Sequence, residues 1–142
     1  MSSPNRSAKT ACDAVSRRIV SLPSNSPILR LEDILENISL IEEYTRNYST
    51  SDFVRDQKCQ DAVERCLLRI SEAAKKLEGV IETMIPSQPW SAIRAVGNVL
   101  RHDYDRVDPN VIWRIVSEDL NPLKKAVESS VNELRRQIPD PT

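Results

Sequence analysis

The chain has 142 residues, of which 39% are hydrophobic and 29% are charged, and this length and balance suit one domain with a buried core. The formal net charge of −1 excludes a uniformly basic surface, so any nucleic acid has to be bound by a local patch. The chain contains only two glycines, Gly79 and Gly97, which argues against an all-β or doubly wound fold, because both need glycine at many turns.

Apolar residues and cysteines indicate the compartment. No apolar run approaches the roughly 20 residues that span a bilayer, and no apolar stretch of signal-peptide length stands near the N-terminus. The three cysteines, Cys12, Cys59 and Cys66, are an odd number without paired spacing, and we expect reduced thiols rather than metal ligands. We therefore expect a soluble, cytoplasmic protein that binds no membrane.

The first 26 residues differ in composition from the rest of the chain. They are rich in serine, asparagine, proline and basic residues, and they carry one short amphipathic stretch, Ala8–Val20. Such a segment does not bury a core of its own. We expect residues 1–26 to form a flexible N-terminal extension, with at most a loose helix, and residues 27–138 to form one helical domain.

Two helices are predicted in the first half of this domain. The first begins at Ser26-Pro27, an N-cap residue followed by proline at the first helical position, and runs to about Asn47. The second follows a cap at residues 50–52 and ends near Gly79, which suits a helix end. Apolar residues recur at helical spacing, at Leu31, Ile34, Leu35, Ile38 and Ile41 in the first helix and at Val63, Cys66, Leu67, Ile70, Ala74 and Leu77 in the second.

The third helix is predicted from Trp90 to about His102, after a loop in which Ile81–Ile85 can form one turn. At about 100° per residue, the two sides of this helix differ in polarity. The core side carries Trp90, Ile93, Val96, Gly97 and Leu100. The other side carries Arg94, Asn98, Arg101, His102 and Asp105.

The fourth helix is predicted to begin at Asp108-Pro109, again a cap followed by proline. Its apolar stripe consists of Ile112, Ile115, Val116, Leu120, Leu123, Val127, Val131 and Leu134. Because Pro122 falls inside this pattern, the helix should kink or restart near Asn121. Helices joined by short links predict an all-α fold, an antiparallel bundle of four to five helices.

The polar side of the third helix holds the only histidine of the chain, His102. An unperturbed imidazole exchanges protons near pH ~6.5. Arg94 or Arg101 could bind a phosphate, and Asn98 could orient the histidine or the substrate. These are the parts for metal-independent RNA cleavage, in which a base takes the proton of a 2′-hydroxyl that attacks the adjacent phosphate. Periodicity alone favours a simpler interpretation, a solvated helix face.

Other chemistries find little support in the sequence. One histidine without a cluster of cysteines or carboxylates does not suit a zinc site, and neither a glycine-rich phosphate loop nor a nucleophile elbow is present. Gly97 stands in the middle of the third helix, where glycine costs roughly 1 kcal/mol relative to alanine. Either a helix or ligand approaches it closely, or it is merely tolerated. Tyr104 faces the core if the helix continues past His102, and it is exposed if the helix ends there.

Several motifs occur in an order that is typical of one family. They are Leu31-Glu32-Asp33-Ile34-Leu35 through Glu42-Glu43-Tyr44, Gln60-Asp61-Ala62-Val63, Ile70-x-Glu72-Ala73-Ala74-Lys75, Pro89-Trp90, Ile93-Arg94, Asn98-x-Leu100-x-His102-x-Tyr104, Val107-Asp108 and Ile112-Trp113. Over about residues 29–134 the chain resembles the HepT-like family of the HEPN superfamily of helical nucleases. The resemblance implies a HEPN-like bundle that forms a homodimer, with both copies of the motif facing one cleft.

The resemblance also implies a function. Members are toxins of type VII HepT/MntA-like toxin–antitoxin systems, ribonucleases that cut RNA rather than DNA without a metal or another cofactor. His102 matches the catalytic histidine, and Asn98 matches the polar residue that commonly follows the motif arginine. Tyr104 matches the tyrosine to which the antitoxin, a minimal nucleotidyltransferase of the MntA type, adds AMP.

One departure from the family motif concerns its arginine, which would fall at Gly97. Arg94 precedes His102 by seven intervening residues, outside the family spacing, whereas Arg101 is adjacent to the histidine. Either arginine could supply the charge. Alternatively, the chain is a non-catalytic module that pairs with a nucleotidyltransferase or binds a nucleotide, or a structural helical protein without partner chemistry. A gain of RNase activity in Gly97→Arg would indicate that the natural site is impaired.

Overall fold

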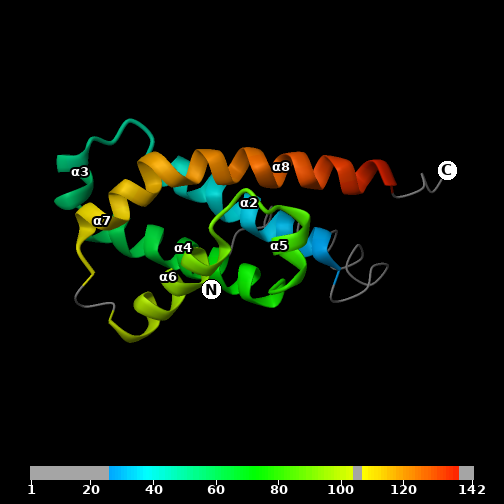
Figure 1. Ribbon diagram of the computed structural model, residues 1–142. Helices are drawn as coiled ribbons and strands as arrows, with labels where there is room; N and C mark the ends of the chain where they lie inside the picture. Colours follow the sequence, from blue (N-terminus) through cyan, green and yellow to red (C-terminus); the bar gives the residue numbers. More distant parts are fainter. Residues whose placement is uncertain (1–25, 104–106, 138–142) are drawn as a thin grey trace, which may run out of the picture.

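The computed structural model describes residues 26–103 and 107–137, and all regular structure within them is helical (Figure 1). In chain order the elements are α2 (Pro27–Tyr44), α3 (Thr50–Val54), α4 (Gln57–Lys76), α5 (Val80–Met84), α6 (Trp90–His102), α7 (Pro109–Arg114), a π-helical turn (Ile115–Asp119) and α8 (Leu120–Gln137). The predicted all-α class is therefore confirmed. The stretch Ala8–Val20, and with it the predicted extension up to residue 25, lies outside the described residues.

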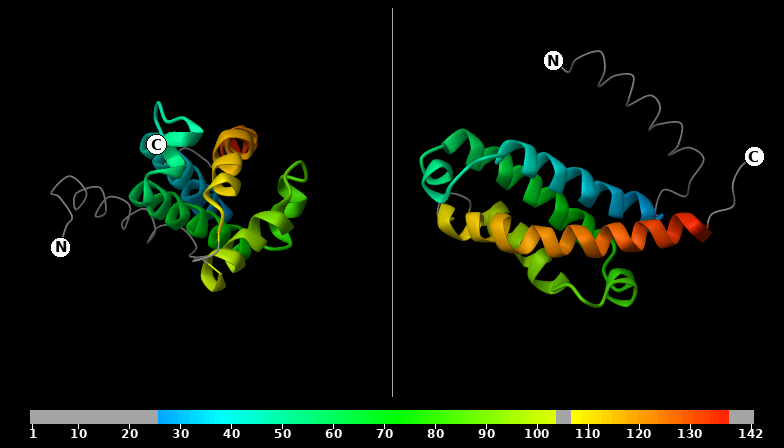
Figure 2. Two further views of the ribbon diagram at one scale, coloured as in Figure 1. Left: turned by 90° about the vertical axis from the view of Figure 1, so that its left-hand side faces the viewer. Right: turned by 90° about the horizontal axis from the view of Figure 1, so that it is seen from above.

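Three long helices, α2, α4 and α8, form the body of the bundle. Helix α2 packs against both α4 and α8, and each of these runs antiparallel to it (Figure 2). Helix α6 packs against α4. Four side chains of α2 are completely buried: Leu31, Ile34, Ile38 and Ile41. Since burying one such side chain contributes about 1.5–3 kcal/mol, α2 provides the centre of the core.

The first helix confirms the prediction at its start and ends earlier than predicted. Pro27 occupies the first helical position after Ser26. Helix α2 ends at Tyr44 instead of near Asn47. Asn47 has a φ angle of 64°, in the left-handed region, which a right-handed helix does not accommodate.

The second helix is split in two, so the prediction of one continuous helix was wrong. The N-cap of α3 is Ser49, one residue before the predicted cap. Its hydroxyl accepts the backbone N–H of Asp52 at 3.2 Å, and the carboxylate of Asp52 accepts the backbone N–H of Ser49 at 2.9 Å. Asp56 then caps α4 by accepting the backbone N–H of Cys59 at 3.0 Å. An aspartate that bonds to the backbone in this way begins a new helix and interrupts the previous one.

Side chains on both sides stabilise this break. The Nε2 group of Gln60 donates to the carbonyls of Phe53 and Val54, at 2.9 and 3.0 Å. The hydroxyl of Tyr48 donates to the carboxylate of Asp56 at 2.5 Å. This hydrogen bond lowers the pKa of Asp56 and raises that of Tyr48 to about 12. None of these partners is visible in the helical periodicity.

The segment between α4 and α6 contains a short helix. Gly79 lies near the end of α4, as predicted, and its φ of 87° is in the left-handed region that favours glycine. Helix α5 follows directly, so the predicted turn at 81–85 is confirmed as a helix that begins one residue earlier. The indole N–H of Trp90 donates to the carbonyl of Ile85 at 2.7 Å, which connects this segment to the start of α6.

The fourth predicted helix begins where expected and restarts beside the predicted position. Asp108 accepts the backbone N–H of Asn110 at 2.9 Å, and Pro109 occupies the first helical position. A π-helical turn over Ile115–Asp119 interrupts the helix, and α8 begins at Leu120, which confirms the predicted restart near Asn121. Because Pro122 lacks an N–H and crowds the carbonyl four residues earlier, a wider turn immediately before it relieves the conflict.

The two described cysteines, Cys59 and Cys66, are buried free thiols on α4, as predicted for them. Burial raises the pKa of both thiols. Cys12 lies outside the described residues. No helix in the described part of the chain is long and apolar enough to cross a membrane.

Candidate active site

Helix α6 carries the predicted site residues. Its apolar side faces the core and its polar side faces outward, as predicted. The inner side consists of buried or half-buried Trp90, Ile93, Val96, Gly97 and Leu100. On the outer side, Asn98 and His102 are exposed, and Arg94 and Arg101 are partly buried. Tyr104 and Asp105 lie outside the described residues, so both interpretations of Tyr104 stay open.

Gly97 marks a close approach of α6 to α4. A Cβ on residue 97 would lie 2.0 Å from the Oγ and 2.7 Å from the Cβ of Ser71, which is itself buried. The Ser71 hydroxyl also donates to the backbone carbonyl of Arg94 at 3.2 Å. The prediction of a close approach is thus confirmed, with a helix as the neighbour, and the interpretation of a merely tolerated glycine was wrong.

Arg101 lies over this glycine. Its Nη1 atom is 3.6 Å from the position that a Cβ on Gly97 would take. The same Nη1 forms an ion pair with the carboxylate of Glu72 on α4, and Nη2 donates to the Oδ1 of Asn98 at 2.8 Å. A guanidinium has more N–H donors than these two contacts use, so Arg101 is held in place and retains donors for an anion.

Arg94 has a different environment at the other end of α6. Its guanidinium forms an ion pair with Glu82, lies 3.6 Å from a carboxylate oxygen of Glu78, and donates to the carbonyl of Ala74 at 3.4 Å. Its hydrogen bond to Glu82 lowers the pKa of that carboxyl. The side chain is 16% exposed. Arg94 therefore connects α6 to α4 and α5, and the structure does not bring it together with Arg101.

His102 is the last residue of α6, and its imidazole is exposed. It stands one turn after Asn98, so these two side chains are on the same side of the helix, and it directly follows Arg101 in the chain. The negative end of the helix dipole suits the basic residues of this last turn. The arrangement combines a proton acceptor with an oriented cation on an open surface.

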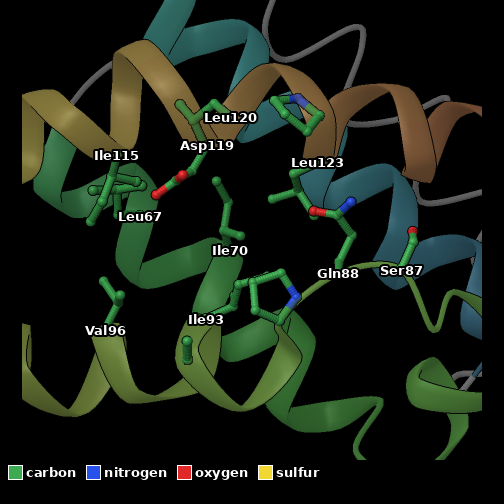
Figure 3. Close-up of a pocket in the computed structure, with 13 residues that line it drawn as sticks. Leu67, Ile70, Ser87, Gln88, Ile93, Val96, Ile115, Asp119, Leu120 and Leu123 are labelled. Atoms are coloured by element: carbon green, nitrogen blue, oxygen red, sulfur yellow. The ribbon is translucent and has the colours of Figure 1, made fainter.

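A separate apolar pocket lies on the inner side of α6. It has a volume of about 340 Å³ and is bounded by α4, α6 and the start of α8 (Figure 3). Its apolar walls include Leu67, Ile70, Ile93, Val96, Leu120 and Leu123. Among the described residues, Asp119 is its only carboxylate, and His102, Asn98, Arg94 and Arg101 do not line it. The candidate chemistry is therefore on the opposite side of α6 from this pocket.

The chain matches one protein family over a range that contains this site. The family described as Ribonuclease HepT-like matches residues 34–130, a range that includes all of α4 and α6. The chain belongs to the HepT-like ribonuclease family. This confirms the resemblance found in the sequence.

Individual HepT-like relatives match over nearly their whole length. A protein of Thermococcus cleftensis named "Probable ribonuclease HepT" is 42% identical over 98 residues, which cover 69% of this chain and 89% of the relative. A candidate RNase of Methanocaldococcus jannaschii is 33% identical over 98 residues, or 69% of this chain and 90% of the relative. A candidate RNase of Caldanaerobacter subterraneus is 31% identical, with shares of 69% and 88%. No solved structure matches the chain.

Two residues of this HepT-like site were missed by sequence reasoning, Ser71 and Glu72. Both belong to α4, and both act on α6, one by approaching Gly97 and the other by pairing with Arg101. Glu72 belongs to the motif Ile70-x-Glu72-Ala73-Ala74-Lys75, and this motif was the only feature of the sequence that pointed to it. Helical periodicity assigns it to an outer face and does not indicate which helix it meets.

Proposed function

We propose that this chain is a metal-independent endoribonuclease, the toxin of a type VII HepT/MntA-like toxin–antitoxin system. His102 serves as general base or acid, Arg101 binds the scissile phosphate, and Asn98 orients Arg101. The observation that carries this proposal is the guanidinium of Arg101, 3.6 Å from the Cβ position of residue 97, where the family motif has its arginine. Arg101, one turn after Gly97 on the same helix, thus supplies the positive charge that the family motif has at position 97.

The proposed reaction transfers the phosphoryl group within the RNA. His102 accepts the proton of a 2′-hydroxyl while that oxygen bonds to the adjacent phosphorus. The bond from phosphorus to the 5′-oxygen breaks, and this oxygen takes a proton from a second imidazole. The products are a 2′,3′-cyclic phosphate and a 5′-hydroxyl. Arg101 stabilises the negative charge that builds up on the phosphoryl oxygens.

A homodimer would supply the second imidazole. With two copies of α6 facing one cleft, one His102 acts as base and the other as acid. An exposed apolar side chain beside the site supports a contact of this kind, since Val99, next to Asn98 on α6, is 47% exposed. Dimerisation follows here from the family pattern, and equilibrium sedimentation of the purified protein tests it.

Regulation is proposed to act through Tyr104, two residues after His102. A minimal nucleotidyltransferase antitoxin of the MntA type would add AMP to its hydroxyl. The added phosphate brings bulk and negative charge to the cleft and would compete with RNA for Arg101. Incubation with the antitoxin and ATP should block cleavage by the wild type, whereas Tyr104→Phe should stay active.

Cleavage of total RNA and tRNA in EDTA tests the proposal, with His102→Ala beside the wild type. Loss of general acid–base catalysis should lower the rate by about 10²–10⁴-fold, while circular dichroism and the dimer stay unchanged because the imidazole is exposed. Cleavage by the wild type alone supports the assignment. Equal cleavage by both proteins contradicts it.

A second candidate function is a non-catalytic module that pairs with a nucleotidyltransferase or binds a nucleotide. The observation in its favour is the carboxylate of Glu72 beside Arg101, because a negative charge at this point opposes a second anion. A wild-type protein that neither cleaves RNA nor carries AMP by mass measurement would favour this module over the nuclease.

A further inference from the structure

A polar groove between α2 and α4 extends from the candidate site. It has a volume of about 550 Å³. Its wall includes Glu72, the residue that forms the ion pair with Arg101, so the groove and the candidate site share a side chain. Among the described residues, four cations line the groove: Arg30, Arg65, Arg69 and Lys76. The carboxylates that line it in the same ranges are Asp33, Glu36 and Glu72.

The ion pairs leave this groove with a positive surplus. Arg30 lies 3.7 Å from a carboxylate oxygen of Asp33, and Glu72 is paired with Arg101. Arg65, Arg69 and Lys76 are exposed, and within the described ranges no carboxylate lies within 4.0 Å of their charged nitrogens. Glu36 is the one groove carboxylate without such a pair among the described residues. The surplus is local, since the whole chain has a net charge of −1.

The unpaired cations follow the axis of α4. Arg65, Arg69 and Lys76 are four and seven positions apart in the chain and so lie on one face of the helix. With a rise of about 1.5 Å per residue, Arg65 and Arg69 are about 6 Å apart along the axis. This spacing is comparable with that of neighbouring phosphates in a nucleic-acid strand, and guanidinium groups bind phosphates in bidentate geometry.

We propose that the α2–α4 groove is the path along which the RNA strand reaches His102, with Arg65 and Arg69 binding phosphates next to the scissile one. The inference rests on the proposed function, of which it names the substrate path. Polar walls and exposed guanidinium groups fit a polyanion, and the carboxylate of Glu72 is paired with Arg101 rather than with Arg65 or Arg69. Neither arginine belongs to the family motif around His102.

The test compares Arg65→Ala/Arg69→Ala with Lys125→Ala/Arg136→Ala. Both doubles remove two exposed positive charges, but Lys125 and Arg136 are on α8 and do not line the groove. Binding of a fluorescent 2′-O-methyl RNA, which has no free hydroxyl to attack, is followed by anisotropy from about 50 to 200 mM salt. Loss of two phosphate contacts should weaken binding at low salt and flatten the slope of log Kd against log salt by about 1.4 for single-stranded RNA.

A third double variant, Arg65→Lys/Arg69→Lys, keeps the charge and should retain most of the slope. Thermal melts show that each protein is folded before binding is measured. In cleavage assays, the alanine double should raise KM while kcat at saturating RNA stays within about twofold. Equal slopes for the groove and α8 doubles, an effect on kcat alone, or a wild type that does not bind the RNA would overturn the proposal.

The two proposals fail in different ways in these experiments. A wild type that binds RNA through Arg65 and Arg69 without cleaving it would contradict the nuclease and leave the RNA path intact. A wild type that cleaves RNA with a Kd and a KM independent of both arginines would do the opposite. Binding and cleavage are therefore both measured on the same preparations.

Discussion

The two ends of α6 each present an arginine, and the two arginines have different neighbours. Arg94 is 16% exposed, and its guanidinium contacts two carboxylates and a backbone carbonyl. Arg101 is 27% exposed and contacts one carboxylate and one amide on an open surface. The first is enclosed by partners from α4 and from the α5 segment, whereas the second is oriented and still accessible. The comparison indicates that the partners of an arginine, more than its position on a helical wheel, decide whether it stabilises the fold or can bind a substrate.

The largest difference should appear in catalysis. Arg101→Ala is expected to lower kcat/KM for RNA cleavage by about 10²-fold, because one charge-stabilising donor is typically worth this much. Arg101→Lys should recover part of the loss, since it keeps the charge and loses the bidentate geometry. Arg94→Ala is the matched control and should change kcat/KM by less than about threefold in the folded protein. Equal losses in both alanine variants would remove the distinction between the two ends of α6.

The next effect concerns the packing between these ends. Gly97→Arg forces a Cβ to within 2.0 Å of the Ser71 hydroxyl, so it should destabilise the fold by about 1–3 kcal/mol and should not increase RNase activity. Denaturant unfolding measures this, with Ala95→Arg as a control because residue 95 is exposed on the same helix. Ser71→Gly should recover much of the stability of a Gly97→Ala variant. A stable and more active Gly97→Arg protein would show that the close approach is not rigid.

Arg94 should matter for stability instead. Arg94→Ala removes the hydrogen bond to the Ala74 carbonyl and the contacts of the partly buried side chain, which are worth about 1 kcal/mol. Arg101→Ala should be closer to neutral, because its contacts are at the surface. Thermal melts of the two variants measure the difference. A larger loss of stability in Arg101→Ala than in Arg94→Ala would contradict the structural role assigned to Arg94.

The smallest expected effect is a change in the pKa of Glu82 when Arg94 is replaced. Arg94 lowers the pKa of Glu82 from its ordinary value of 4.5, so this carboxylate stabilises the fold at neutral pH and loses that contribution as pH falls through its folded pKa, below 4.5. Arg94→Ala should raise the Glu82 pKa and weaken the acid dependence of stability. Arg101→Ala should leave both unchanged. Carbon-detected NMR titration of the Glu82 carboxyl, beside melts across the acid range, distinguishes the two variants.

Much of the fold could be predicted from local patterns. The start of α2 at Pro27 and the start of α7 at Pro109 follow from a cap residue before proline, a signal confined to two adjacent residues. The break before α4 was missed, because helical periodicity does not show that Asp56 caps a new helix through Cys59, nor that Tyr48, eight residues away, donates to Asp56. The restart near Asn121 followed from Pro122, but the π-helical form of the turn before it was not visible in the sequence pattern.

The candidate site divides in the same way. The sequence by itself determined the family and the face of α6 on which His102, Asn98 and Arg101 lie, because helical periodicity and motif order are local properties of the chain. Only the tertiary structure decided that Gly97 makes room for Ser71, and that Arg94 and Arg101 have different partners. The physical reason is that these contacts join residues more than ten positions apart, and the packing of α6 on α4 and the α5 segment selects them.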